Sequence, residues 1–483
     1  MEENKEVQEE IKEEPKEEVK VVNTDTNSKN GENRCPECGA SDVTYNIKKK
    51  KLVCNYCATE FDPENIEGLE KDLKNLEGET RTTGVKDIDK DANDVITLKC
   101  GGCGAEVVIN TREATNARCH WCRSILSINS QIENGAVPDL VLPFDLEKKT
   151  AQEKIENFVS KRQFFAHPTF KKEFTTENIM GVYFPYLLVD ANCSGKFAGE
   201  GGHVAREYTI TKRNSKGEEE KETVYDIDLY DVERDFDITI DDLTVESSKD
   251  KLDKNNKNKT TNVINAIMPF DTENCVKYKA NYLVGYSSEK RDINISNIEE
   301  KVDKELQDVG RHALNADLKF YDSGVEWNKE DFKIKGKQWV SAYLPVWLYS
   351  YQDPNKILHY VAVNARTGET MGSVPMNKKR LWTITILIFI LFLIIALFAH
   401  DKDEAPIVIT IVGLVVSLVF YGLKVSKYRN KGARHTYELE TKHELKVTRR
   451  VDNHTHTKRE CSSRYIAGAN NKMITGEYTN IKE

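Results

Sequence analysis

Eight of the eleven cysteines in this 483-residue chain fall into two frames with the same spacing. In each frame two C-x-x-C pairs are separated by fifteen residues, and the second frame lies 65 residues after the first. This is the spacing of tetrathiolate zinc sites, in which a hairpin between the pairs brings four sulfurs to one ion. The sequence therefore predicts two zinc ribbons, each with one structural zinc ion. The expected ligands are Cys35, Cys38, Cys54 and Cys57 in the first ribbon and Cys100, Cys103, Cys119 and Cys122 in the second.

Redox chemistry and disulfide bonding are the alternatives for cysteines in such pairs. A thioredoxin-like C-x-x-C motif needs a surrounding βαβ pattern, whereas both frames lie among short polar and alternating segments. Disulfides need an oxidising compartment, and the amino-terminal stretch "MEENKEVQEEIKEE" lacks the apolar region of a signal peptide. We therefore expect reduced thiols. Four thiolates would complete a tetrahedron and leave no position open for a catalytic water.

The other candidate metal ligands match no standard site. His120 lies inside the second pair of its frame, where it would crowd the ligands as a fifth donor, so we expect it at the surface. Three further cysteines are isolated, and we expect them to be small packed residues. Four histidines in the tail could form a secondary metal site with Cys461, but a solvated polar tail is the favoured interpretation. These residues are Cys193, Cys275 and Cys461, and His435, His443, His454 and His456.

Two long apolar runs lie near the carboxyl end of the chain. The run "LWTITILIFILFLIIALFA" (381–399) has nineteen residues without a charge, and "IVITIVGLVVSLVFYGL" (407–423) has seventeen. Each is long enough to cross a bilayer as a helix, and such runs rarely occur in soluble domains, which makes a buried core helix the weaker alternative. The sequence thus predicts an integral membrane protein with a transmembrane helical hairpin of two spans.

Basic residues flank both runs on the same side. Three precede the first run at 378–380, and four follow the second run within 424–431, while the connecting loop has a single lysine. By the positive-inside rule, both termini would face the cytoplasm. We therefore expect a multi-pass protein of the plasma membrane, which agrees with reduced cysteines.

Much of the amino-terminal third is hydrophilic. Residues 1–33 are predicted to be a disordered acidic tail, because they contain almost no large apolar side chains. Residues 62–98 are predicted to be an acidic linker that contains at most one short helix at 66–76. The ribbons, at 34–61 and 99–127, would then be two small domains on a flexible chain. The net charge of −9 gives no chain-wide attraction to nucleic acid or anionic lipid.

A strand-rich α+β domain is expected between the ribbons and the membrane, at 138–376, and a basic and polar cytoplasmic tail at 424–483. Aromatic and β-branched runs indicate strands, and a 3.6-residue apolar period indicates helices. The whole chain is therefore multidomain: two ribbons, an α+β domain and a helical hairpin. The expected strands lie within 179–195, 341–353 and 358–374, and the expected helices at 146–161 and 296–315.

Two short words are repeated in order inside this middle domain. "LPFDLE" at 142 is echoed by "MPFDTE" at 268, and "YFPYLL" at 183 by "YLPVWL" at 343. The repeats predict two related lobes, 138–246 and 263–376, joined by a polar loop near 247–262. The alternative is chance convergence of proline-bearing strands.

The sequence contains no phosphate-binding loop, nucleophile elbow or H-E-x-x-H pair, so no small-molecule substrate is evident and we expect no enzyme. Four adjacent lysines at a predicted hairpin tip are the main candidate contact with a polyanion. They also fit a solvated turn that offsets the charge of a zinc tetrathiolate. A membrane-tethered nucleic-acid-binding protein is therefore the alternative to a protein-binding adaptor. The lysines are Lys48, Lys49, Lys50 and Lys51.

The order of these parts resembles a known family. Two C-x-x-C ribbons, the L-P-F words, "GVYFPYLLVD", "YLPVWLYSY" with "VAVNARTGETMGSVP", and a basic-flanked hairpin are similar to bacterial membrane-bound proteins with a TFIIB-type zinc ribbon. Such chains are often mislabelled as the primosomal helicase PriA, but this sequence lacks the nucleotide loop of a helicase. The resemblance covers roughly residues 35–423. It departs from the common C-x-x-C-G pattern at Ala58 and Arg123.

This resemblance implies a non-enzymatic adaptor. Similar proteins hold soluble or membrane-associated partners, including PspA-like and SPFH-type proteins, at the cytoplasmic face of the membrane. A role in envelope stress is the corresponding expectation. The residues of the tail after Tyr428 match no part of the family pattern.

Overall fold

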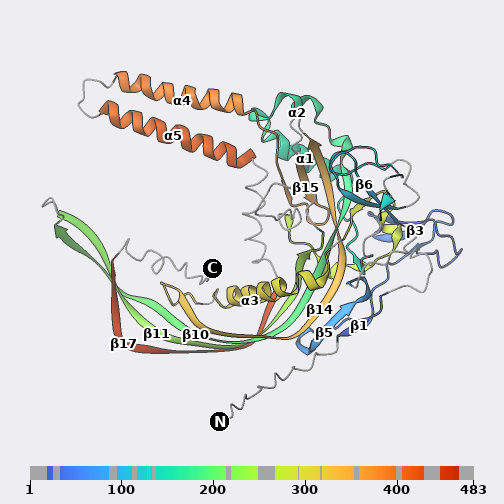
Figure 1. The fold of residues 1–483 in the computed structure, drawn as a ribbon, viewed down its shortest axis with the longest axis horizontal. Coiled ribbons are helices and arrows are strands. Elements are labelled where there is room, and N and C mark those ends of the chain that lie inside the picture. Colours follow the sequence, from blue (N-terminus) through green and yellow to red (C-terminus); the bar gives the residue numbers. More distant parts are fainter. Residues whose placement is uncertain are drawn as a thin grey trace, which may run out of the picture.

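A computed structural model gives the fold of the chain (Figure 1). Its secondary structure is dominated by one fourteen-stranded mixed sheet, to which two four-cysteine clusters and a pair of apolar helices are attached. The structure describes residues 19–24, 33–85, 95–110, 117–127, 129, 131–132, 137–213, 219–248, 267–291, 293–315, 318–352, 358–398, 405–428 and 446–466.

Four unusually long strands form a curved arm (Figure 1). Strand β10 (Met180–Arg213) pairs antiparallel with both β11 (Glu219–Glu246) and β14 (Val325–Gln352), and β11 also pairs with β17 (Lys446–Ile466). Register shifts interrupt β10 between Val189 and Ala191 and between Val204 and Arg206. Such bulges increase local twist and bend, which accounts for the curvature of strands of this length.

Helix α3 (Glu299–Asn315) covers the concave side of the arm (Figure 1). Its apolar stripe, which includes Val302 and Leu306, packs in one core cluster with Phe236 and Trp339 of the strands. Gly310 is needed at the crossing, because a Cβ there would lie 2.9 Å from the Phe332 ring. The helix therefore buries the apolar residues of the arm nearest the body.

The helices and strands predicted from local patterns are present. Helix α1 (Lys148–Ser160) and helix α3 lie within the two predicted helical segments. Strands β15 (Leu358–Asn364) and β16 (Thr370–Gly372) form the predicted hairpin, and β15 pairs with β14. The prediction of a strand-rich α+β sheet is confirmed at this level.

The repeated sequence words lie beside each other. In the β10–β14 pair, Tyr183 is opposite Pro345 and Pro185 is opposite Tyr343. This register is symmetric about the pair of Phe184 and Leu344. Such symmetry is expected of two copies of one unit related by a local twofold axis. The join between the predicted lobes near 247–262 lies outside the described residues beyond Ser248.

The predicted acidic linker takes part in the sheet. Strand β5 (Gly78–Thr82) pairs in parallel with β14, and β1 (Lys20–Val22) pairs in parallel with β5. The prediction of a flexible linker is therefore wrong for residues 78–82, and that of a disordered tail is wrong for 20–22. Backbone pairing with a long neighbouring strand stabilises these polar segments, and composition alone does not reveal such a partner. The short helix expected at 66–76 is replaced by a single 3-10 turn, η1 (Leu73–Asn75).

The tail also contributes a strand. Residues 446–466 form β17 along the arm, so this part of the predicted polar tail is a strand, and its described side chains are mostly exposed. His454 accepts or donates a hydrogen bond at 3.1 Å with the Tyr321 hydroxyl. His435 and His443 lie outside the described residues, as do the side chains of His456 and Cys461.

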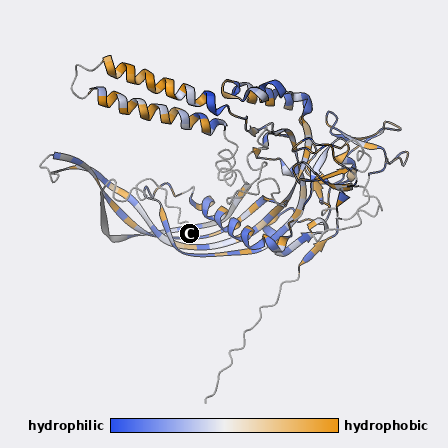
Figure 2. Cartoon of the chain, turned by 45° about the horizontal axis from the view of Figure 1, so that its top comes forward, coloured by the Kyte–Doolittle hydropathy of each residue, from blue (hydrophilic) through white to orange (hydrophobic). Residues whose placement is uncertain are grey.

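Helices α4 (Lys378–Phe398) and α5 (Ala405–Tyr428) form an antiparallel pair that extends from the body (Figure 1). Gly413 lets them approach closely, because a Cβ there would lie 2.3 Å from Cβ of Phe392. Figure 2 shows the apolar residues running along both helices and the polar residues along the arm. Both helices are long and apolar enough to be candidate membrane spans. In both views the pair and the arm extend from the body in the same direction.

Shorter elements complete the fold. The remaining strands are β2 (Val43–Asn46), β3 (Lys51–Cys54), β4 (Glu60–Phe61), β6 (Val95–Lys99), β7 (Glu106–Asn110), β8 (Gln131–Ile132), β9 (Leu140–Val141), β12 (Val276–Lys277) and β13 (Ser287–Glu289). The remaining helical elements are α2 (Pro168–Glu173) and the 3-10 turns η2 (Thr83–Val85), η5 (Gln163–Phe165), η6 (Thr176–Asn178), η8 (Thr272–Asn274), η9 (Ala280–Leu283) and η10 (Ile295–Asn297).

Candidate metal centres

Each predicted cysteine frame forms one compact cluster of sulfurs. All four sulfurs of a frame lie within 4.8 Å of one another. Two Sγ–Sγ distances in the first cluster are 3.4 and 3.7 Å, and two in the second are 3.4 and 3.6 Å. A zinc ion with sulfur ligands at about 2.3 Å requires tetrahedral edges of about 3.8 Å. The two clusters could therefore each hold a metal ion, and their donor set fits zinc.

The four C-x-x-C turns share one backbone geometry. In each turn the amide of the residue after the second cysteine donates to the carbonyl of the first cysteine, at 2.8 to 2.9 Å. That residue has a positive φ of 72° at Gly39, 61° at Ala58, 82° at Gly104 and 64° at Arg123. Ala58 and Arg123 thus adopt the left-handed conformation that glycine provides at the other two turns. Where the sequence departs from C-x-x-C-G, the glycine is replaced by Ala58 or Arg123, but the backbone conformation of the turn is kept.

Hydrogen bonds favour the anionic form, which binds a metal, at one sulfur of each cluster, whereas the hydrogen bond with Cys103 and burial raise the pKa of Cys119, and burial raises the pKa of Cys122. The Thr59 hydroxyl and backbone amide lower the pKa of the Cys57 thiol to about 6. A hydrogen bond from Cys119 lowers the pKa of Cys103 to about 5. Metal binding at these clusters would accordingly need little proton release from these two sulfurs at neutral pH.

The second cluster is built into the large sheet. Strand β7, which follows Cys103, pairs antiparallel with β13, and β13 pairs in parallel with β10. Cys100 and Cys119 belong to the same core cluster as Phe184 of β10. The prediction of a ribbon on a flexible chain is therefore wrong for this ribbon, because backbone pairing and a shared core fix it to the body.

His120 is buried, so its prediction as a surface residue is wrong. Its Nδ1 lies 3.2 Å from the Ser287 hydroxyl, and its Nε2 lies 3.6 Å from Glu289. Its neighbour Trp121 donates an indole hydrogen bond to Glu289. The two residues between the cysteines thus anchor the second cluster to β13. This role depends on the pairing of β7 with β13, and no local sequence pattern predicts it.

The first ribbon has its own three-stranded sheet, β2–β3–β4, but it also contacts the body. The Asn281 side-chain amide donates to the carbonyl of Val43 at 2.9 Å. Tyr45 lies against Tyr282, with ring centroids 5.6 Å apart, and burial raises the pKa of Tyr45 to about 12. Val43 and Leu52 belong to a core cluster shared with β14. This ribbon is therefore docked as well.

The four-lysine turn is matched by carboxylates. Each lysine has an ion-pair partner, two of which lie on the segment that leads into α1. The pairs are Lys48 with Glu147, Lys49 with Glu60, Lys50 with Asp145 and Lys51 with Asp62. Such local neutralisation weakens the case for a phosphate-binding tip, which remains a prediction.

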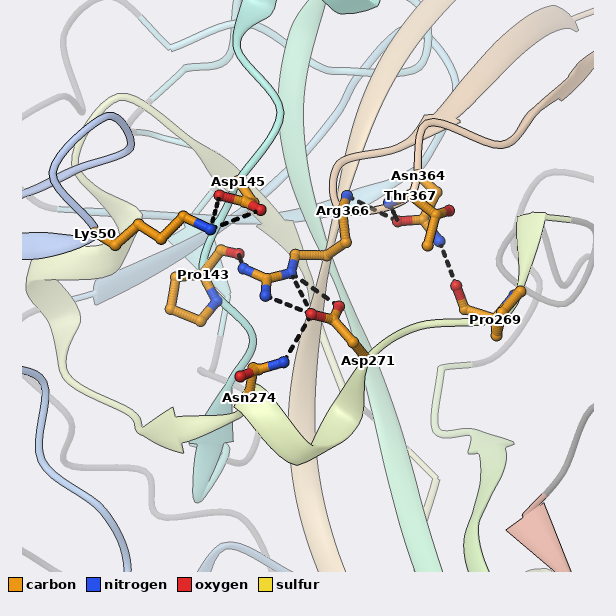
Figure 3. Close-up of polar contacts among 9 residues, drawn as sticks. All are labelled: Lys50, Pro143, Asp145, Pro269, Asp271, Asn274, Asn364, Arg366 and Thr367. Carbon is orange, nitrogen blue, oxygen red and sulfur yellow. Dashed lines mark hydrogen bonds and ion pairs between the residues drawn. The ribbon is translucent and has the colours of Figure 1, made fainter.

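Both repeated L/M-P-F-D words meet at one arginine (Figure 3). Arg366 donates from Nε to the Asp271 carboxylate at 2.8 Å and from Nη1 to the Pro143 carbonyl at 3.1 Å. Lys50 of the first ribbon reaches Asp145 beside them at 2.8 Å (Figure 3). Burial alone would raise the pKa of Asp271, but hydrogen bonds and charge from Arg366 hold it below its usual value. Since the folded pKa is lowered, the pair stabilises the fold at neutral pH and loses this effect only in acid.

We expect Arg366→Met to lower the free energy of unfolding by about 3–5 kcal/mol, because it leaves a partly buried carboxylate without its partner. The measurement is the shift in denaturant midpoint of the metal-loaded full chain in detergent. The matched control is Lys196→Met, which removes a pair between exposed Lys196 and Asp235 and should cost at most about 1 kcal/mol. Equal shifts in the two variants would contradict the structural role of Arg366.

A third group of possible metal ligands, made of carboxylates, was not predicted from the sequence. The carboxylates of Asp190, Asp241 and Asp242 lie within 4.8 Å of one another at a bulge of the β10–β11 pair. Asp190 accepts hydrogen bonds from the Asp242 amide at 2.9 Å and from Gln338 at 3.1 Å. Burial raises the pKa of Asp190 to about 6. These bonds hold Asp242 in its left-handed conformation, at φ 54°, which gives the cluster a structural role in the bulge.

Comparison with protein-family models, with curated proteins and with solved structures found no match to this chain. What is established is therefore structural: two four-cysteine clusters that resemble zinc ribbons, a large mixed sheet, and two contacting apolar helices.

Proposed function

We propose that this protein is a non-enzymatic, membrane-anchored zinc-ribbon adaptor that holds protein partners at the cytoplasmic face of the bacterial plasma membrane. Two structural zinc ions would stabilise the ribbons. The observation that carries the proposal is the exposure of the α4–α5 pair. Leu387, Leu391 and Leu418 are each more than half exposed, although the pair is the most apolar part of the chain. A bilayer would cover such side chains.

The orientation of the anchor is supported by charge. The pair joins the body at its basic end, where Lys378 to Arg380 begin α4 and Lys424 and Lys427 end α5. By the positive-inside rule, the body and both termini would then lie in the cytoplasm. Reduced cysteine clusters are compatible with that compartment.

The ribbons would act as fixed parts of a binding surface. Both are docked on the sheet, which removes the freedom expected of tethered modules. Each carries an exposed apolar side chain in or just after its second C-x-x-C turn: Tyr56 in the first ribbon, 82% exposed, and Ile125 three residues after Cys122, 69% exposed. Exposed apolar residues on a rigid turn suit a protein contact, because little conformational entropy is lost on binding. PspA-like or SPFH-type partners are the ones that the family resemblance suggests.

The test is crosslinked capture of the full chain from membranes, with mass spectrometry of the captured proteins. If Tyr56 and Ile125 contact the partner, Tyr56→Ser with Ile125→Ser should reduce capture about tenfold or more, as expected when a hot spot worth about 2 kcal/mol is lost. Phe320→Ser, on an exposed residue of the turn before β14, is the matched control and should leave capture unchanged.

Treatment with nuclease separates the two functional classes. Capture that survives nuclease supports the adaptor, and nuclease-sensitive capture supports the nucleic-acid-binding alternative. Undiminished capture by the Tyr56/Ile125 double variant would place the binding surface elsewhere on the body.

A further inference from the structure

We propose that the segment 161–172, between the end of α1 and α2, binds the headgroups of anionic phospholipids. We call this segment the shelf. The inference rests on the proposed membrane anchoring and adds to it a second, peripheral contact made by the body of the protein. Its components are three exposed lysines, Lys161, Lys171 and Lys172, and the exposed ring of Phe164.

The shelf is fixed to the base of the helical pair. His167 donates its amide to the Pro375 carbonyl at 2.7 Å, and Asn377 donates to the Phe165 carbonyl at 2.7 Å. Phe165 in turn donates its amide to the hydroxyl of Tyr428, the last residue of α5, at 3.3 Å. These bonds hold the shelf beside the first turn of α4 and the last turn of α5. If the pair spans a bilayer, the shelf lies at headgroup level.

The three lysines of the shelf are not neutralised within the described residues. Lys161, Lys171 and Lys172 form no ion pair there, in contrast to the four lysines of the first ribbon. Glu173 is the first acidic residue after the segment. Basic clusters next to a span attract anionic lipid by about 1 kcal/mol per residue near the surface.

Phe164 gives the shelf an apolar contact. Its side chain is 57% exposed, and the Arg380 guanidinium lies over its ring at 4.3 Å. An aromatic ring flanked by cations is the combination that interfacial segments place at the boundary between headgroups and acyl chains. Free phosphate would satisfy the lysines but would leave the ring in water, which favours a lipid surface as the ligand.

The experiment uses the full chain in two kinds of nanodisc, one of neutral phosphatidylcholine and one with added phosphatidylglycerol. Lysine acetylation is followed residue by residue by mass spectrometry. We expect Lys161, Lys171 and Lys172 to react about fivefold more slowly in the anionic disc, the ratio equivalent to about 1 kcal/mol. Lys20 of β1 and Lys99 of β6, on strands outside the shelf and the helical pair, should react equally in both.

Two variants make the test specific. Lys171→Glu with Lys172→Glu should remove the protection of Lys161, whereas Lys20→Glu with Lys99→Glu should preserve it. Equal reactivity of the shelf lysines in both discs, with α4 and α5 protected from amide exchange, would overturn this inference alone. Rapid exchange throughout α4 and α5 would show that the pair is outside the bilayer, and would overturn both the anchoring and the shelf.

Discussion

Replacing Cys100 and Cys103 by serine should reduce bound zinc from two ions per chain to one and should open the sheet beyond the ribbon itself. A structural zinc ion supplies about 10–16 kcal/mol of apparent binding free energy, as much as the whole stability of many domains. Because β7 pairs with β13 and Cys100 shares a core with Phe184, we expect faster amide exchange in β6, β7 and β13. Elemental analysis and exchange mass spectrometry measure the two effects.

The first ribbon provides the comparison. Cys35→Ser with Cys38→Ser should also remove one ion, but opening should be concentrated in 33–61, because this ribbon has a separate sheet. Cys275→Ala, which changes a cysteine outside both clusters, should retain both ions. Loss of both ions from either double variant would show that the two sites do not bind independently.

Arginine at four exposed positions of the helical pair should release the protein from membranes. The changes are Leu387→Arg, Leu391→Arg, Leu414→Arg and Leu418→Arg. At the centre of a span each arginine costs about 2.5–3.5 kcal/mol, so the four together should outweigh insertion of the hairpin. The measurement is the fraction of full-length protein that stays with membranes after an alkaline wash.

The control for the arginine variant replaces the same four leucines by isoleucine and should remain in the membrane. Deleting everything after Pro375 would be a poor alternative, because it would also remove β17 from the arm. Native protein found in the soluble fraction would contradict membrane insertion. The exposed pair would then be a surface for another protein.

Features set by short stretches of chain could be predicted from the sequence. Metal-ligand spacing is local, and so is helical periodicity, which is why the sulfur clusters and helices α1 and α3 were found. What could not be predicted depends on partners distant in sequence. Strand β17 forms against β11, about 220 residues away, and β5 forms between β1 and β14. Polar segments such as these carry too little apolar pattern to indicate a strand.

The candidate site shows the same division. The eight ligands and the positive-φ turns follow from the C-x-x-C pairs, whereas the burial of His120 depends on Ser287, 167 residues later. The four lysines of the first ribbon formed a clear local cluster, but their carboxylate partners include Asp145, 95 residues after Lys50, and Glu147. A cluster of lysines in a sequence therefore overestimates the unpaired positive charge of the folded protein when carboxylates distant in sequence form ion pairs with them.

The shared direction of the arm and the helical pair imposes a condition on membrane insertion. A bilayer about 30 Å thick around α4 and α5 would overlap the arm as the two are arranged in Figures 1 and 2. The arm carries exposed charges such as Lys196 and Lys458, which hydrocarbon excludes. Insertion would therefore require the arm to swing away from the pair, and the bulges of β10 are where its curvature can change.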